Sequence, residues 1–145
     1  SGATPPLLSP ELFRQIELPA LKLMVSMVSE ISGNPVPCII GGNTASIVHS
    51  IMETNAGYVI CPSETDQELF MHEMEKWPDA MVRINIKPDG FSSGNIDFIY
   101  SELDRVMALV AHRGKACIGT GVLPFETNPD LVIRAMEYVE KSLFL

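Results

Sequence analysis

The sequence predicts an α/β fold with a parallel sheet, because four short apolar segments alternate with segments of helical periodicity. The apolar segments show no polar/apolar alternation, which is typical of strands covered on both faces. A helix between successive parallel strands requires right-handed crossovers. Two architectures fit: a small open doubly wound sheet, or half of an eight-stranded (β/α) barrel, whose usual size is about 250 residues. The predicted strands span residues 36–40, 58–61, 81–86 and 115–118.

A long helix is predicted before the first strand. Ser9 is a candidate N-cap, and Pro10 suits the first helical position. Pro19 lacks an amide hydrogen, so it should kink or split this helix. Gly33 and Asn34 should end it, because both tolerate a left-handed backbone.

The other helices follow the strands. The second should begin at a cap on Asn43 or Thr44. Before the third, residues 63–68 hold two overlapping capping boxes, Ser63 with Asp66 and Thr65 with Glu68, and that helix should run to about Trp77. Residues 87–90 are predicted to be a loop. The last two helices are predicted over residues 95–112 and from the cap sequence Asn128-Pro129-Asp130 onward.

Composition limits the classes of function. The chain has 145 residues, which suits a single domain over residues 1–145. Its formal net charge is −8 and it has no basic run, which argues against nucleic acid and anionic membranes as partners. No apolar stretch reaches the length of a membrane span and no signal peptide is visible, so we expect a soluble, cytoplasmic protein. Three widely spaced cysteines fit reduced thiols better than disulfides.

Functional groups are expected at the carboxyl ends of the strands, where both architectures place their sites. The first of these ends carries Gly42, Asn43 and Thr44. They form either an ordinary helix cap or an anion site built from backbone N–H groups, and both interpretations are open. Cys38 should lie on the opposite face of the strand from Ile39, and we interpret it as a buried thiol of the core.

Five segments, in this order and spacing, resemble one superfamily. They are "LLSPELFRQIELPALK" (7–22), "PVPCIIGGNT" (35–44), "AGYVI" (56–60), "NIKP" (85–88) and "GTGVLPFETNPDLVIRAM" (119–136). The chain resembles the C-terminal half of the uroporphyrinogen decarboxylase family, whose superfamily includes cobalamin-dependent methyltransferases that act on thiols such as coenzyme M. The resemblance implies the C-terminal half of a (β/α)8 TIM barrel, four parallel strands alternating with helices. It also implies that this chain is a fragment of a longer protein.

The residues that mark the two best-known branches of that superfamily are replaced here. The thiol methyltransferases bind zinc through a His-x-Cys-Gly strand end and a later Gly-Cys-Gly turn. The resemblance places Ile39, Gly41 and Thr120 at these three ligand positions, so no metal site is expected. The decarboxylases usually carry a histidine in the Gly-x-Gly turn, where this chain has Thr120. Lys87 also departs from the commoner Asn-Leu-Asp-Pro sequence.

The resemblance therefore implies a divergent corrinoid-dependent methyltransferase that lacks the zinc ligands. A catalytically inactive binding or assembly subunit, a divergent tetrapyrrole decarboxylase and a free-standing flavodoxin-like domain are the alternatives. We expect no cofactor in the fragment itself and a corrinoid or tetrapyrrole in the full-length protein. The expected partners are a corrinoid protein or a small molecule, and a second copy of the half barrel that covers its open sheet edges. The expected substrate-binding residues are Gly42, Asn43, Thr44, Asn85 and Thr120.

Overall fold

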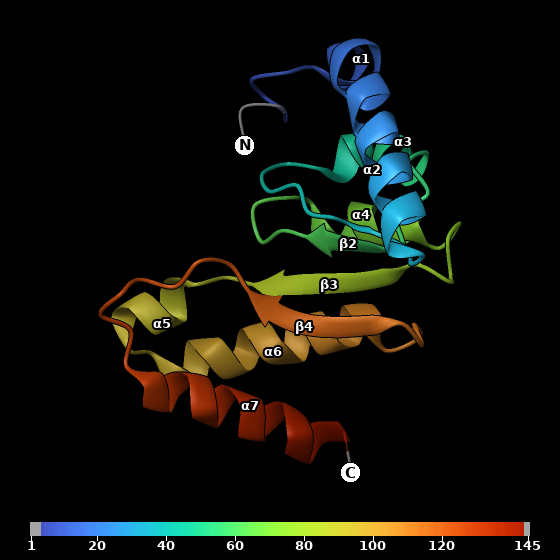
Figure 1. Ribbon diagram of the computed structural model, residues 1–145. Helices are drawn as coiled ribbons and strands as arrows, with labels where there is room; N and C mark the ends of the chain where they lie inside the picture. Colours follow the sequence, from blue (N-terminus) through green and yellow to red (C-terminus); the bar gives the residue numbers. More distant parts are fainter. Residues whose placement is uncertain (1–3, 144–145) are drawn as a thin grey trace.

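The computed structural model describes residues 4–143 and shows an α/β chain built on one four-stranded parallel sheet (Figure 1). The strands lie in the order in which they occur in the sequence, β1-β2-β3-β4, and every neighbouring pair is parallel. The predicted alternation of parallel strands and helices is confirmed. The strands are β1 (Pro37–Cys38), β2 (Tyr58–Cys61), β3 (Met81–Ile86) and β4 (Ala116–Thr120).

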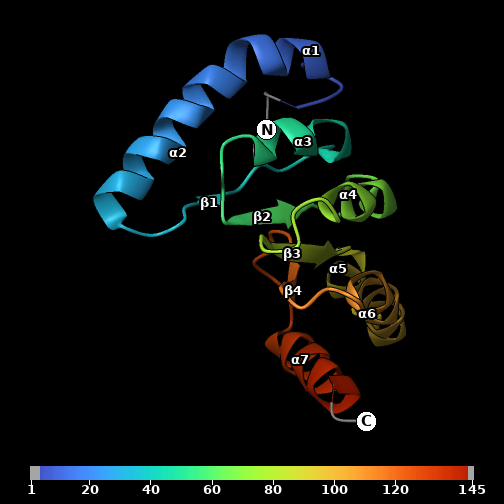
Figure 2. The same cartoon turned by 90° about the vertical axis from the view of Figure 1, so that its right-hand side faces the viewer.

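The helices between the strands lie on one side of the sheet. Figure 2 shows α3, α4 and α6 on that side, with α2 next to the first strand and α7 next to the last. A doubly wound sheet reverses its strand order at a switch point and so acquires helices on both faces. This sheet has no such reversal, which is compatible with half of a (β/α) barrel. The helices are α1 (Pro10–Leu12), α2 (Leu18–Ser32), α3 (Val48–Met52), α4 (Gln67–Met74), α5 (Asp89–Ser93), α6 (Ile96–Val110) and α7 (Pro129–Leu143).

The first helical region is divided as its sequence predicts. The Ser9 hydroxyl accepts a hydrogen bond from the Leu12 amide at 3.2 Å, which confirms the N-cap. A π-helical segment, η1 (Phe13–Glu17), separates α1 from α2, and Pro19 is the second residue of α2. The wider turn accommodates a residue that has no amide hydrogen to donate. Gly33 ends α2 with φ of 65°, as expected of a helix C-cap.

Three boundaries differ from the sequence-based expectation. The first strand covers only Pro37–Cys38 instead of residues 36–40. Pro37 within it and Pro35 just before it have no amide hydrogen for the ladder. The last strand continues through Gly119 and Thr120, because both residues pair with the end of β3. Residues 87–90, predicted as a loop, include the start of α5, which Gly94 ends with φ of 73°.

The predicted capping boxes before α4 are wrong. Asp66 is the N-cap, and its carboxylate accepts from the Leu69 amide at 3.0 Å. The Ser63 hydroxyl donates to the neighbouring Glu64 carboxylate instead, and Thr65 is buried and turned towards the end of β1. The helix also ends at Met74, three residues before Trp77.

The core lies between the sheet and the helices on its covered side. Strand residues at alternate positions face these helices and are almost completely buried. Cys38 is on this side at 5% exposure while Ile39 is 59% exposed, which confirms the predicted strand phase and the core thiol. The main members of this core are Val59, Cys61, Val82, Ile84 and Ile86 from the strands, with Phe70, Met74, Ile99, Leu103 and Val106 from α4 and α6.

The opposite side of the sheet is covered only in part: Ile60 and Asn85 are buried there, whereas Cys117 is exposed, so the expectation that the strands are covered on both faces holds only in part for the described residues. We call this side the open face and define it by Tyr58, Ile60, Arg83, Asn85, Cys117 and Gly119, which alternate with the core residues and pair in register. Cys117 is exposed, and Tyr58 and Arg83 are half-buried. Among residues 4–143, no helix is long and apolar enough to span a membrane.

Candidate functional site

The turn after β1 carries three of the predicted binding residues, and it is closed by a threonine from the next turn. The Thr65 hydroxyl accepts from the amides of Thr44 at 3.0 Å and Ala45 at 2.8 Å. It donates to the Asn43 side-chain oxygen, also at 3.0 Å. Two of the backbone N–H groups at this helix start, those of Thr44 and Ala45, are thus paired within the protein, which favours the structural interpretation of this turn.

Gly42 also suits a tightly packed turn at this position. Its φ is 90°, a conformation that favours glycine, and an added Cβ would lie 2.6 Å from the Thr4 hydroxyl oxygen. Asn43 is exposed, whereas Thr44 is completely buried and its hydroxyl oxygen has no hydrogen-bond partner. Thr44 precedes a 3₁₀ turn, η2 (Ala45–Ile47), and its side chain makes no capping hydrogen bond.

Asn85 and Thr120, the other two predicted binding residues, lie on opposite faces of the sheet. Thr120 pairs with Ile86 and therefore shares the covered face. It lines a mainly apolar cavity of about 310 Å³ between the sheet, α6 and α7, together with Ile118, Val132 and Met136. Asn85 belongs to the open face, so the structure does not bring these two side chains into one site.

The open face holds a polar cluster that consists of Tyr58, Arg83, Asn85 and Cys117. Arg83 and Cys117 are direct partners across β3 and β4. The Arg83 Nε and the Asn85 Oδ1 are both buried without a hydrogen-bond partner. Burial of the Tyr58 phenol raises its pKa, with Arg83 lowering it and Cys117 raising it further, so the phenol lies within electrostatic reach of both.

Gly119 makes room for the arginine of this cluster. An added Cβ would lie 2.8 Å from the Arg83 Cδ and 3.1 Å from the Asn85 Oδ1. The Arg83 stem therefore lies across the strand at Gly119, towards the carboxyl end of the sheet. A larger residue at position 119 would displace the arginine.

Behind the same rim, a buried hydrogen-bond network joins the ends of β2 and β3 to the helices. The Gln67 amide donates to the Asn85 backbone oxygen at 2.8 Å and to the Pro62 oxygen at 3.0 Å. Its oxygen accepts from Arg105 at 2.8 Å, and Arg105 forms two hydrogen bonds to Glu102, at 2.9 and 2.8 Å. These contacts fix the backbone from which the Asn85 side chain projects.

The charge on Glu102 is stabilised by this network. The hydrogen bonds from Arg105 lower the pKa of the Glu102 carboxyl, against the opposing effect of burial, and the Lys87 amide adds a hydrogen bond at 3.2 Å. Glu102 is only 6% exposed. A carboxylate buried to this degree is stable only when paired, so we assign it a structural role at the rim.

A second hollow, of about 430 Å³, lies away from the rim between α4 and α6. Its wall includes His72, Glu75, His112 and Arg113. The Arg113 guanidinium donates hydrogen bonds to three backbone oxygens at the end of α4 and in the turn that follows. They belong to Met74, Trp77 and Ala80. This arginine closes the amino-terminal side of β3, and His72 lies 3.7 Å from the Glu75 carboxylate on the wall of the hollow.

The three positions that the resemblance assigns to zinc ligands offer no coordinating cluster. Ile39 is exposed, Gly41 has no side chain, and Thr120 faces the helices. Within residues 4–143, no three His, Cys, Asp or Glu side chains are grouped closely enough to hold a metal ion. Burial raises the pKa of the Cys61 thiol to about 12, so this cysteine is a core residue rather than a ligand.

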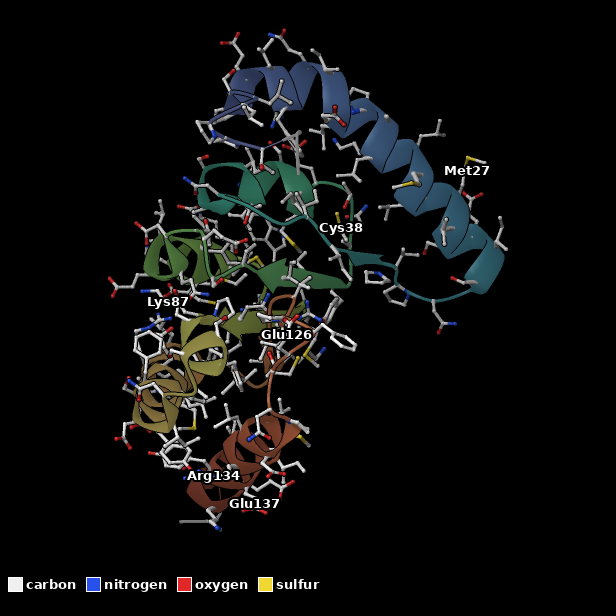
Figure 3. All side chains as sticks on the ribbon, turned by 90° about the vertical axis from the view of Figure 1, so that its left-hand side faces the viewer. Met27, Cys38, Lys87, Glu126, Arg134 and Glu137 are labelled. Atoms are coloured by element: carbon white, nitrogen blue, oxygen red, sulfur yellow. The ribbon has the colours of Figure 1, made fainter. Side chains whose placement is uncertain are left out.

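Sequence reasoning missed the polar cluster, although one signal points to it. Arg83 and Asn85 stand at alternate positions within the third apolar segment, "MVRINI", and alternate residues of a strand share a face. An arginine in the middle of a buried strand is rare unless it is paired. Glu126 and Lys87, labelled at the rim in Figure 3, are both exposed and lie outside the cluster.

Comparisons with family models and with curated protein sequences identify no relative of this chain. No protein-family model matches it, and no curated protein sequence does either. The family resemblance therefore rests on the sequence segments alone.

Proposed function

We propose that the chain is half of a uroporphyrinogen decarboxylase-like (β/α) barrel and acts in corrinoid-dependent methyl transfer. The observation that carries the proposal is the winding of the sheet. Four parallel strands in sequential order have their helices on one face and polar side chains on the other. A (β/α) barrel is wound in this way, with its ligands bound at the carboxyl ends of the strands.

The proposed role of this chain is to bind and orient the ligand rather than to activate a thiol. Ile39, Gly41 and Thr120 provide none of the soft ligands with which zinc activates a thiol. The unpaired polar atoms of Arg83 and Asn85 suit the amide or carboxylate side chains that surround a corrinoid or tetrapyrrole ring. A corrinoid, when bound, supplies a transferable methyl group. Arg83 and Tyr58 would hold its polar periphery against the open face.

A titration tests this proposal. Hydroxocobalamin and uroporphyrin are added separately to the protein, and the absorption spectrum is followed. We expect a saturable spectral change that weakens about tenfold in Arg83→Gln, because hydrogen bonds from a charged donor are the strongest in such a site. Arg134→Gln is the matched control, since Arg134 is exposed on α7 and lies away from the cluster (Figure 3).

The result assigns the class. Saturation with hydroxocobalamin supports a corrinoid protein, and saturation with uroporphyrin alone supports the tetrapyrrole decarboxylase. If neither pigment gives a saturable change, or if Arg134→Gln weakens binding as much as Arg83→Gln, the proposed ligand class is wrong. A methyl-transfer assay with methylcobalamin then tests the reaction itself.

The second candidate function is an inactive binding or assembly subunit, and the surface of α2 favours it. An apolar stripe along this helix is exposed, and Met27 projects from it away from the rest of the chain (Figure 3). Exposed apolar surfaces of this kind mark protein contacts. The strands at both edges of the sheet also have one unpaired side. The stripe consists of Leu23, Met24, Met27, Val28 and Ile31.

Sedimentation velocity tests this candidate. If a second copy covers the edges and the α2 stripe, the protein sediments as a dimer at micromolar concentration, and the change Leu23→Lys with Met27→Lys shifts it to the monomer. The control is Ser26→Lys, which adds one positive charge at an exposed position of α2 outside the stripe, and each of the two stripe substitutions is compared with it singly as well as together. A wild-type monomer at all concentrations would contradict self-association.

A further inference from the structure

The open-face cluster contains buried polar atoms that have no hydrogen-bond partner within the described residues, and it lies on the side of the sheet opposite the apolar core. Arg83 and Asn85 come from the same strand, two residues apart, and their side chains share a face. Asn85 is 4% exposed, yet its side-chain oxygen has no partner. The Arg83 Nε is also buried and unpaired. Buried polar groups in proteins are nearly always paired, so the Arg83 Nε points to a missing hydrogen-bond acceptor and the Asn85 Oδ1 to a missing donor.

The chemistry of the donors specifies the ligand class. Arg83 presents a planar guanidinium, which recognises carboxylates and phosphates through paired hydrogen bonds. The Tyr58 phenol and the Asn85 side-chain nitrogen are neutral donors beside it, whereas the unpaired Asn85 Oδ1 is an acceptor and takes a hydrogen bond only from a protonated group. No acidic residue belongs to the open face, so the arginine has no carboxylate from its own face to neutralise it. Gly119 keeps the space into which the arginine extends.

We propose that Arg83, Asn85 and Tyr58 form a binding site for a carboxylate or phosphate group on the open face, directly beside the thiol of Cys117. This inference rests on the part of the proposed function that places the ligand on the open face, and it adds the group that is recognised. It does not depend on the ligand being a corrinoid or a tetrapyrrole.

Cys117 provides a direct test, because it is the exposed cysteine of the three and the cross-strand partner of Arg83. Iodoacetate and iodoacetamide alkylate a thiolate by the same reaction. The sulfur bonds to the methylene carbon as iodide leaves, and the thiol proton passes to the solvent. Only iodoacetate carries a carboxylate. If Arg83 binds that carboxylate, iodoacetate alkylates Cys117 with saturation kinetics and iodoacetamide does not.

The measured quantity is the ratio of the two alkylation rates at Cys117, located by peptide mass analysis of the full chain. Any change in thiol reactivity affects both reagents equally and cancels in the ratio. We expect Arg83→Gln to lower the iodoacetate-to-iodoacetamide ratio about tenfold, as for the loss of a charge-assisted hydrogen bond. Arg134→Gln removes the same charge at a distance and should leave the ratio unchanged, and circular dichroism confirms that each variant is folded.

Competition on the wild-type protein gives a second test that needs no variant. Succinate or inorganic phosphate is added at constant ionic strength, and the alkylation of Cys117 by neutral iodoacetamide is followed. Protection by succinate alone assigns a carboxylate ligand, and protection by phosphate alone assigns a phosphate ligand. Protection by both supports a general anion site. No protection, together with a ratio that is the same in Arg83→Gln as in the wild type, overturns the proposal.

These outcomes separate the two proposals. If the corrinoid and tetrapyrrole titrations fail while anions protect Cys117, the anion site stands and the proposed ligand class is wrong. If the titrations succeed but anions do not protect Cys117 and the rate ratio is the same in Arg83→Gln as in the wild type, the barrel proposal stands and the anion site is wrong.

Discussion

Gln67 is the residue whose replacement best tests the account of the rim. It is 5% exposed and lies at the first position of α4, where its amide reaches the backbone oxygens of Asn85 and Pro62. Its oxygen holds the Arg105 guanidinium. The change Gln67→Met keeps the shape and length of the side chain while it removes both the donor and the acceptor.

The expected cost follows from the hydrogen bonds that are lost. Three of them are 3.0 Å or shorter, at 2.8, 3.0 and 2.8 Å, and a fourth contact, to the Cys61 oxygen, is longer at 3.4 Å. At about 1 kcal/mol for each short bond, the free energy of unfolding should fall by about 3 kcal/mol. That is a large share of the roughly 5–15 kcal/mol that stabilises a typical domain.

Urea unfolding, followed by the fluorescence of the single tryptophan, Trp77, measures this change. With a typical slope of about 2 kcal/mol per molar urea, the midpoint should fall by about 1.5 M. The control is Gln15→Met on the exposed first helical region, whose side chain makes one hydrogen bond to Glu11. We expect that control to cost less than about 0.5 kcal/mol. A Gln67→Met midpoint within the range of the control would refute the structural role of the network.

Three further predictions concern the same elements. The pKa of Glu102 is held below its ordinary value of 4.5 in the folded state, so its charge contributes stability above that value and the contribution is lost as the pH falls through the folded pKa. The stability difference between wild type and Glu102→Gln, from urea unfolding, should therefore be largest near neutral pH and shrink below pH 4.5; an unchanged difference would contradict the pairing. Asp66→Ala should lower the free energy of unfolding by about 1 kcal/mol in thermal or urea unfolding, and Ser63→Ala should leave it almost unchanged, because Asp66 is the N-cap of α4. Equal losses in the two variants would instead support the capping box predicted from the sequence. In the folded protein a thiol reagent such as Ellman's reagent should modify Cys117 rapidly and Cys61 only after unfolding, and rapid modification of Cys61 would show that the core is open.

Local features of the fold were predictable because they act within a few residues. The cap at Ser9, the break before Pro19 and the helix end at Gly33 depend on hydrogen bonds and backbone angles that the residues themselves dictate. The alternation of strands and helices followed from apolar periodicity. The capping boxes before α4 failed because the hydroxyl of Thr65 instead pairs with amides about twenty residues away.

The candidate site was predictable only in outline. The carboxyl-end rim is a general property of parallel sheets, and Asn85 was correctly expected there. The pairing of Arg83 with Cys117 depends on the register between β3 and β4, which no local pattern specifies. Thr120 was assigned to the same rim, but its phase on β4 turns it towards the helices.

The sequence by itself thus determined the α/β class, the helix ends and the buried phase of Cys38, since these follow from side-chain type and local geometry. Only the tertiary structure decided that the four strands stand in sequential order and that one face of the sheet remains polar. The physical reason is that strand order and register are set by contacts between segments twenty or more residues apart in the chain. Those contacts place Tyr58, Arg83, Asn85 and Cys117 side by side, although they are spread over three strands.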